Sequence, residues 1–243
     1  MNNAMKEIHL FYAPELPDRL ALPDEEAGHA VRVLRMKDGD PLLATDGRGT
    51  FYECTLLSAS PKHCALQIER SFPGDHLWAG HIHLAVAPTK NMDRIEWLAE
   101  KATEIGFDEL TFLLCKNSER KVIKTERVEK IVVSATKQSH KAHKPEVHEL
   151  TRIADFLRQP RTGKKYIAHC LAEEGALPFL FHLLPTEGEV TVLIGPEGDF
   201  TPEEVALAEA AGYQSVSLGR SRLRTETAAL VAVQLANLKQ QKG

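Results

Sequence analysis

Long apolar runs are missing from this sequence of 243 residues, which nowhere reaches the ~18 consecutive apolar residues of a membrane-spanning helix. The amino-terminal segment also lacks the basic and then apolar pattern of a secretory signal. Cysteine is scarce, and Cys54, Cys64, Cys115 and Cys170 form no C-x-x-C pair, so neither a zinc ribbon nor a disulfide framework is indicated. These absences predict a cytoplasmic protein in a reducing compartment.

Two further absences narrow the class of protein. No stretch fits G-x-G-x-x-G, the commoner loop for a nucleotide cofactor, and no internal repeat or low-complexity tract occurs. The net charge is -4 and 26% of the residues are charged, which is an ordinary composition for a globular protein. The length suffices for one large or two small domains with a sizeable core.

A strand, a glycine loop and a helix are predicted in the carboxyl-terminal part. Val190 to Ile194 is apolar and rich in β-branched residues, which is typical of a strand buried in a parallel sheet. It runs into the loop Gly195-Pro196-Glu197-Gly198. Thr201, Pro202 and Glu204 then predict a helix that begins with a capping box.

A second run of the same kind follows it. Tyr213 to Leu218 predicts a strand, Gly219 to Arg224 a loop, and Thr225 to Lys239 a helix. Ligands of open α/β sheets bind beyond the carboxyl ends of the strands, so the two loops, side by side, form a candidate pocket. Ordinary strand-to-helix turns explain the same spacing equally well, because Gly and Pro mark turns everywhere.

The two loops carry a resemblance that is more specific than their spacing. GPEGDF, which starts at Gly195, and LGRSRLRTETA, which starts at Leu218, resemble the paired signatures of the RsmE family, methyltransferases of ribosomal-RNA uridine in the SPOUT superfamily. Asp199 stands where the family has a second glycine, and Ser221-Arg222 where it has Arg-Ile. The resemblance implies an α/β fold with a trefoil-knotted, SPOUT-type parallel-sheet methyltransferase domain, S-adenosylmethionine as cofactor, and a homodimer.

The resemblance also implies which residues hold S-adenosylmethionine. They lie in the loops after three strands and in the first turns of the last helix. These residues are Leu171, Gly195, Pro196, Glu197, Gly198, Leu218, Gly219, Leu223, Thr225, Thr227 and Ala228. The segment Ala172-Glu173-Glu174 enters a loop that closes over the cofactor in this family.

Methylation of uridine at N3 requires a group that takes the N3 proton and a cation that stabilises charge on the flanking carbonyl oxygens. Arg224 and Glu226 are of the right types beside the cofactor loop, and Glu197 is a second candidate base. Loop ordering is the alternative role, for Glu197 alone or for Arg224 paired with Glu226. The competing hypothesis for the whole chain is a ribosome-binding or assembly module without catalysis.

The amino-terminal part is rich in predicted strands. Asp24 to Leu34 predicts a short helix, and the turn Asp46 to Gly49 predicts a hairpin. The stretch that starts at His29 resembles the front of the RsmE family, where a PUA-like β-barrel helps to hold RNA. The resemblance favours phosphate contacts for Arg32 and Arg35 over solvated helix charges.

Together these features predict two domains. Residues 1–72 are expected to form the PUA-like RNA-binding domain, and residues 81–243 the methyltransferase domain with the knot at its carboxyl-terminal end. Residues 73–80 contain proline and glycines between periodic segments and are predicted to be the linker.

Basic residues concentrate between Lys116 and Lys144, where nine Lys and Arg stand against three acids. In an acidic protein this surplus favours the docking of a polyanion over an ordinary mixed-charge face, and 16S ribosomal RNA, within the small subunit, is the partner that the resemblance implies. Paired charges on a solvated face remain the alternative for the helix Asn91 to Ile105, since Glu100 and Glu104 lie near its cations. The predicted RNA contacts are Lys90, Arg94, Lys101, Arg120 and Lys141, which match family motifs, and Lys137, which belongs to the basic cluster. Lysine at 141 replaces the family's arginine and loses its bidentate fork.

Two pairs of histidines, His81-x-His83 and His140-x-x-His143, have a spacing that is compatible with binding a metal ion. No nearby Cys or carboxylate set completes four ligands, so surface or strand histidines are favoured and no metal is expected.

The last helix is apolar on two sides, and one fold layer buries only one of them, which supports a homodimer. One stripe comprises Ala228, Val231, Ala232, Leu235 and Leu238, and the other comprises Ala229, Leu230, Val233 and Ala236.

Overall fold

The computed structural model describes residues 8–172 and 175–242, which divide into two compact units. The first unit contains the residues up to His76 together with Thr136–Lys144, and the second contains Leu77–Ala135 and the residues from Pro145 onward. Glu173 and Glu174, part of the segment expected to close over the cofactor, lie outside the described residues. No helix in the described ranges is long and apolar enough to cross a membrane.

The first unit is built on a five-stranded sheet with the order β1-β3-β4-β5-β2. The strands are β1 (Leu10–Tyr12), β2 (Ala21–Leu22), β3 (Pro41–Thr45), β4 (Thr50–Ser60) and β5 (His63–Pro73). The predicted hairpin is confirmed, because β3 and β4 pair antiparallel across the turn at Asp46. The Asp46 carboxylate shapes this turn, as its Oδ1 accepts the N–H groups of Arg48 (2.8 Å) and Thr50 (3.1 Å).

The helix predicted from Asp24 to Leu34 is found in two parts. α1 (Asp24–Gly28) continues directly into the π-helical segment η1 (His29–Val33). Ala27 and Ala30 are fully buried in this segment and pack into the core of the first unit. The exposed residues of η1 and the turn after it include Arg32 and Arg35, and Arg35 adopts a left-handed φ of 55°.

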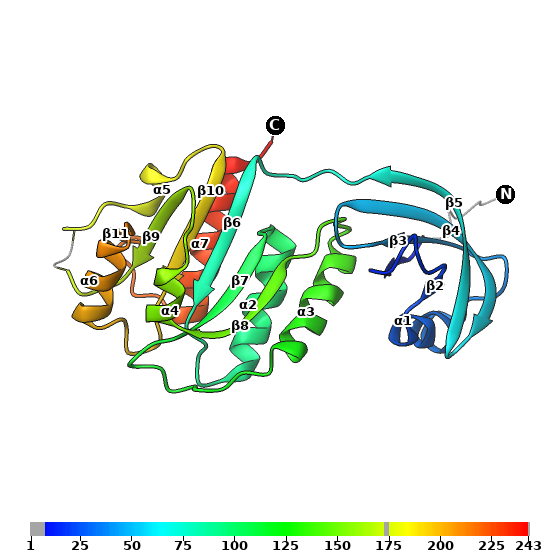
Figure 1. The fold of residues 1–243 in the computed structure, drawn as a ribbon, viewed down its shortest axis with the longest axis horizontal. Coiled ribbons are helices and arrows are strands. Elements are labelled where there is room, and N and C mark those ends of the chain that lie inside the picture. Colours follow the sequence, from blue (N-terminus) through cyan, green and yellow to red (C-terminus); the bar gives the residue numbers. More distant parts are fainter. Residues whose placement is uncertain (1–7, 173–174, 243) are drawn as a thin grey trace. The chain divides into compact units, whose positions relative to one another are not determined.

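The second unit is a six-stranded sheet with the order β11-β9-β10-β6-β7-β8, and every pairing in it is parallel (Figure 1). The strands are β6 (Gly80–Val86), β7 (Glu109–Leu114), β8 (Glu146–Arg152), β9 (Lys164–Ala168), β10 (Gly188–Ile194) and β11 (Gln214–Val216). The predicted α/β class, with a strand-rich unit before a parallel-sheet unit, is confirmed by these two strand orders.

Helices cover both faces of this sheet. One core cluster joins α2 (Met92–Ile105), α3 (Thr125–Gln138), α5 (Leu180–Leu183) and α7 (Thr225–Gln240) to one face. A second cluster joins α4 (Ile153–Arg158) and α6 (Pro202–Ala210) to the other face. In the view of Figure 1, α7 lies behind the sheet and α4 in front of it.

Several boundaries differ from those expected. β9 ends at Ala168 rather than near Leu171, because the N–H of Cys170 turns away to bond the Asp199 carboxylate. β8 and α4 were not foreseen, because β8 is a half-exposed edge strand whose sequence is polar. Trp78, within the predicted linker, is only 3% exposed and donates its Nε1–H to Asp108 Oδ2 at 2.8 Å.

Candidate active site

The carboxyl ends of the strands meet at one edge of the parallel sheet, because all six run in the same direction. The GPEG loop follows β10, and the loop that leads to Arg224 follows β11. The sequence predicted that these two loops lie side by side, but they are separated, because β9 lies between β10 and β11 in the sheet. The pocket predicted from the two loops must therefore also include the loop that follows β9.

The start of α6 has the predicted capping box. Thr201 Oγ1 accepts the N–H of Glu204 at 3.3 Å, and Glu204 Oε2 accepts the N–H of Thr201 at 2.9 Å. The other oxygen, Glu204 Oε1, accepts the N–H of Lys116 at 2.8 Å. One carboxylate thus begins the helix and also fixes the loop that follows β7.

Two further side chains connect the loops at this edge. Glu197 Oε1 accepts the N–H of Lys90 at 2.9 Å, which ties the GPEG loop to the loop before α2. Arg120 donates from Nε to Thr89 O at 3.0 Å and from Nη2 to Lys90 O. The contacts of Glu197 match the loop-ordering alternative, and the Arg120 guanidinium holds backbone carbonyls of its own chain.

The first turn of α7 contains a buried acid. Glu226 is 7% exposed; its Oε1 lies 3.6 Å from Arg94 Nε, and its buried Oε2 has no hydrogen-bond partner among the described residues. Arg224 occupies the N-cap position, is exposed, and makes no side-chain hydrogen bond or ion pair within the described ranges. Glu226 therefore pairs with Arg94, and the alternative pairing with Arg224 is absent from this structure.

The residues expected to hold S-adenosylmethionine lie on the loops of this edge, and two observations fit such a group. Gly219 has φ 120° and no atom within 4 Å of the position that a Cβ would take, so the space beside its Cα is open, although its own N–H and C=O bond to Ser217 Oγ at 3.1 Å. The unpaired Oε2 of Glu226 is a buried acceptor that a bound polar group can satisfy. Leu171 is 47% exposed, while Leu218 and Ala228 pack partly against the core.

The predicted RNA contacts fall in both units. Arg32 and Arg35 are exposed and have no hydrogen bond or ion pair within the described residues. Lys137, also in the first unit, contacts Glu26 with Nζ and Oε1 2.5 Å apart. In the second unit, Lys90 pairs with Glu119 at 3.0 Å.

Lys101 matches the solvated-face alternative. Its Nζ lies 2.7 Å from Glu100 Oε1 and 2.8 Å from Glu104 Oε1 on the same helix. Exposed ion pairs of this kind stabilise a helix only slightly, so Lys101 could leave them to contact an RNA phosphate at little cost in free energy.

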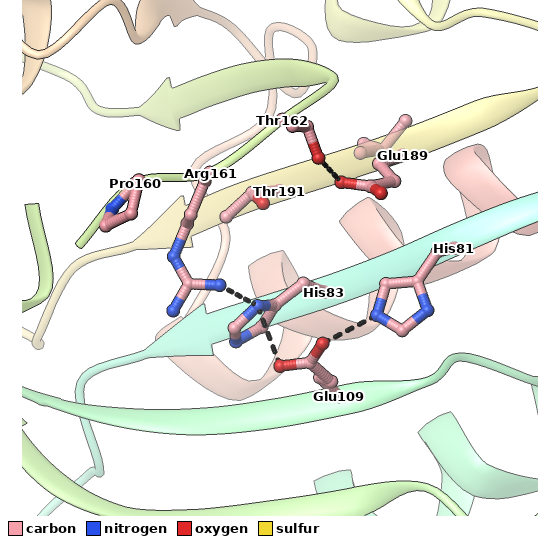
Figure 2. Close-up of a pocket in the computed structure, with 9 residues that line it drawn as sticks. His81, His83, Glu109, Pro160, Arg161, Thr162, Glu189 and Thr191 are labelled. Carbon is pink, nitrogen blue, oxygen red and sulfur yellow. Dashed lines mark hydrogen bonds and ion pairs between the residues drawn. The ribbon is translucent and has the colours of Figure 1, made fainter.

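A separate polar cluster lies at the amino ends of β6, β7 and β10, where a cavity of about 260 Å³ opens (Figure 2). It is lined by His81, His83, Glu109, Pro160, Arg161, Thr162, Glu189, Val190 and Thr191. His81 and His83 attracted attention in the sequence as strand histidines, and they do lie on β6. No local sequence pattern predicted the other members of this cluster, which are Glu109, Arg161 and the neighbouring His148.

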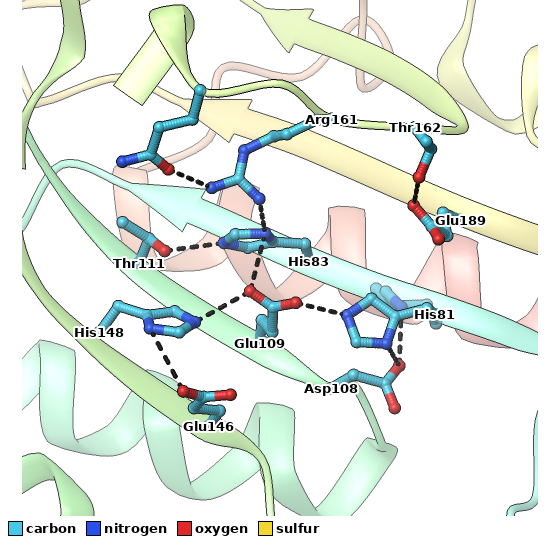
Figure 3. A network of polar contacts seen from close by, with 12 residues as sticks. His81, His83, Asp108, Glu109, Thr111, Glu146, His148, Arg161, Thr162 and Glu189 are labelled. Carbon is cyan, nitrogen blue, oxygen red and sulfur yellow. Dashed lines mark hydrogen bonds and ion pairs between the residues drawn. The ribbon is translucent and has the colours of Figure 1, made fainter. Parts of the chain in front are cut away.

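Three imidazoles surround the Glu109 carboxylate in this cluster (Figure 3). His148 Nε2 lies 2.9 Å from Glu109 Oε2 and His81 Nε2 lies 2.7 Å from Oε1, and these hydrogen bonds hold the pKa of Glu109 well below its usual range. The hydrogen bond to Glu109 raises the pKa of His81 and that of His148.

His83 differs, because burial lowers its pKa to about 3. Arg161 Nη1 donates to His83 Nδ1 at 2.8 Å, so the ring is neutral and its Nε2–H donates to Thr111 Oγ1 at 2.8 Å. The 3.3 Å approach of Nδ1 to Glu109 is therefore not an ion pair. The lone pair of His83 is occupied, and the described residues include no group of three or more potential ligands suited to a metal ion.

Comparison with known proteins gives one match in each half of the chain. A family model described as an RNA methyltransferase domain matches residues 77–237, and one described as an RNA methyltransferase PUA domain matches residues 22–69. The ribosomal RNA small subunit methyltransferase E of Bacillus subtilis is 28% identical over 225 residues, which cover 88% of this chain and 87% of that protein.

Two solved structures share the whole architecture. A probable rRNA methyltransferase from Porphyromonas gingivalis has a TM-score of 0.89 and 43% identity, covering 96% of this chain and 98% of the other. A ribosomal RNA small subunit methyltransferase E from Neisseria gonorrhoeae, bound to S-adenosylmethionine, has a TM-score of 0.81 and 26% identity, covering 93% and 95%. With the paired loop motifs at the carboxyl edge and both domain matches in chain order, this protein belongs to the RsmE family of RNA methyltransferases.

Proposed function

We propose that this protein transfers a methyl group from S-adenosylmethionine to N3 of a uridine in small-subunit ribosomal RNA. The observation that carries the proposal is made at the carboxyl edge of the sheet. There the buried Glu226 Oε2 in the RTETA segment has no hydrogen-bond partner among the described residues, and the space beside Gly219 in the preceding loop is open. A similar structure binds S-adenosylmethionine, and relatives over most of the chain are small-subunit methyltransferases.

The cofactor supplies an electrophilic methyl group. The chain would supply position, because the loops after β9, β10 and β11, with the first turns of α7, would hold the cofactor and the uridine together. Positioning is the main contribution that a protein makes to such an in-line displacement. The residues proposed to hold the group are those implied by the resemblance, from Leu171 through the GPEG loop to Ala228.

Glu226 is proposed to accept the N3 proton of uridine. Its Oε2 is buried and unpaired, and its Oε1 lies 3.6 Å from the Arg94 guanidinium, which holds the carboxylate in place. Arg224 is exposed next to it and is proposed to stabilise the charge that develops on a uracil carbonyl oxygen. Glu197 stays a second candidate base, although its Oε1 is already engaged by the N–H of Lys90.

RNA is proposed to contact both units, through Arg32 and Arg35 in the first and basic residues of the second. A homodimer, with the half-exposed apolar stripe of α7 at its interface, and the trefoil knot remain predictions. Of the predicted stripe Ala228, Val231, Ala232, Leu235 and Leu238, Ala232 is buried in the core of its own unit, Ala228, Val231 and Leu235 are partly buried, and Leu238 is 56% exposed. A cytoplasmic location is proposed because the ribosomal substrate is found there.

The direct test incubates the purified protein with labelled S-adenosylmethionine and small ribosomal subunits from a strain that lacks this activity. We expect one labelled nucleotide, identified as N3-methyluridine by digestion and mass spectrometry. Subunits from a strain that has the activity serve as the control and should accept no label. Salt-sensitive binding to the subunit without any transfer would support the ribosome-binding module instead.

A further inference from the structure

Asp199 occupies a backbone position that normally belongs to glycine. Its φ is 60°, in the left-handed region that a residue with a side chain adopts at a cost. The same position is the one at which this chain departs from the glycine of the RsmE pattern. Aspartate is one of the few residues with a side chain that adopt this conformation, because its short carboxylate can accept hydrogen bonds nearby.

The Asp199 carboxylate makes two such contacts. Oδ1 accepts the N–H of Phe200 at 2.8 Å, which stabilises the turn itself. Oδ2 accepts the N–H of Cys170 at 2.8 Å, across 29 residues of sequence. The first bond is local, but the second connects the loop after β10 to the loop after β9.

The loop that carries Asp199 is itself anchored. Asn117 Nδ2 donates to Gly198 O and to Asp199 O, both at 3.1 Å. Asn117 follows β7, so the Asp199 backbone is held from the opposite side of its loop. The carboxylate therefore acts from a fixed support and holds the N–H of Cys170, while the N–H of the adjoining Leu171 donates to His169 Nδ1 at 3.2 Å.

We propose that Asp199 is a positioning residue that holds the backbone of Cys170 and Leu171 in place for S-adenosylmethionine. This inference rests on the proposed function, because Leu171 is one of the residues assigned to the cofactor. Asp199 contacts neither cofactor nor substrate in this role. It orders the β9 loop in advance, which lowers the entropic cost of cofactor binding and leaves the chemical step unchanged.

The exposed thiol of Cys170 offers a measurement that does not depend on activity. Cys54, Cys64 and Cys115 are buried, so iodoacetamide labelling of the folded protein reports on Cys170. Partial loss of hydration, and next the charge of Asp199, raises the pKa of the Cys170 thiol. Rates must therefore be compared on the high-pH plateau, where the thiol is ionised in every variant.

The test variant is Asp199→Gly, which suits a left-handed φ and removes both carboxylate bonds. We expect plateau alkylation of Cys170 to become several-fold faster, and the Kd and KM for S-adenosylmethionine to rise about tenfold, the scale of one charge-assisted hydrogen bond. The kcat at saturating cofactor should stay within about twofold, because the chemical groups are untouched.

Asp38→Gly is the matched control, because Asp38 Oδ1 likewise accepts a distant backbone N–H, that of Ala59 at 2.7 Å, in the first unit. It should change neither the alkylation rate nor cofactor affinity. Unchanged alkylation and affinity in Asp199→Gly would overturn the inference, as would a fall in kcat with an unchanged KM. If the wild type binds no S-adenosylmethionine, the proposed function fails, while the alkylation rates still decide whether Asp199 orders the loop.

Discussion

The two edges of the parallel sheet in the second unit use polar side chains in opposite ways. At the carboxyl edge, Glu197, Arg120 and Glu204 bond to the backbone of neighbouring loops. At the amino edge, Glu109 and the histidines around it bond to one another. The first arrangement fixes the shapes of loops and leaves Glu226 Oε2 unpaired, whereas the second engages both oxygens of its central carboxylate, although Arg161 Nε in the same cluster has no hydrogen-bond partner among the described residues. We therefore expect catalysis to depend on the carboxyl edge and pH-dependent stability on the amino edge.

The largest expected effect is that of Arg224→Lys at the carboxyl edge. Lysine keeps the charge but loses the planar guanidinium, so single-turnover methylation should fall roughly a hundredfold or more, the scale for one preorganised donor. Binding of S-adenosylmethionine, measured by calorimetry, should change little. Arg220→Lys is the control, because it is an exposed arginine of the same loop without an assigned role. A parallel collapse of rate and cofactor affinity would identify Arg224 as a structural residue.

Glu109→Gln should show the reverse pattern at the amino edge. The substitution leaves His81 and His148 without the carboxylate that pairs with both. The free energy of unfolding in urea at pH 6 should fall by about 2 kcal/mol, the scale for hydrogen bonds to a charged group at a partly exposed site. Methyl transfer at a temperature well below the transition should be unchanged, and a fall in rate without a fall in stability would break the contrast between the edges.

Local sequence patterns located the carboxyl edge correctly. The Thr201 capping box, the β10 strand and the start of α7 all follow from short-range rules, and the family motifs lie on these elements. The order of the strands did not follow, since the placing of β9 between β10 and β11 depends on contacts across the whole sheet. The partner of Glu226 was missed for the same reason, because Arg94 comes from a helix more than one hundred residues earlier.

The amino-edge cluster shows a second limit of sequence reasoning. His83 pairs in register with Glu109 on β7, and Thr111 pairs with His148 on β8. These residues are brought together only by strand pairing, and β8 itself has no apolar run to predict it. The spacing of His81 and His83 drew attention to a metal, whereas the structure gives them a carboxylate and an arginine as partners.

The pH dependence of stability separates the histidines of this cluster. His81 and His148 have raised pKa values, so the stability they contribute is fully present below the unfolded value of about 6.5 and is lost as the pH rises through the folded values. The contribution of His83 to stability depends on pH in the opposite direction. It is fully present above the unfolded pKa of about 6.5 and is lost as the pH falls toward the folded pKa of about 3.

His148→Ala isolates one of these contributions. The difference in unfolding free energy between wild type and variant should be largest near pH 6 and should shrink as the pH rises above the folded pKa of His148. Urea titrations at intervals between pH 5.5 and pH 8.5 measure it. His182→Ala, which removes a histidine outside this cluster, is the control and should give a difference that does not follow this trend. A His148 difference that grows with pH would contradict the assigned pairing with Glu109.

The smallest expected effects on stability come from substituting one threonine at each edge of the sheet. Thr201 Oγ1 caps α6 and is buried, with the residue 8% exposed, whereas Thr162 Oγ1 donates to the exposed Glu189 at the amino edge. Thr201→Ala should cost about 1 kcal/mol of unfolding free energy, the usual scale of an N-cap, and Thr162→Ala should stay within about 0.5 kcal/mol.

The capping box also places Glu204, whose Oε1 holds the N–H of Lys116. Thr201→Ala should therefore raise amide exchange at Lys116, measured by hydrogen exchange, whereas Thr162→Ala should leave it unchanged. Equal exchange in the two variants would show that Glu204 is held without its cap, and that the loops of the carboxyl edge are fixed more independently than their hydrogen bonds indicate.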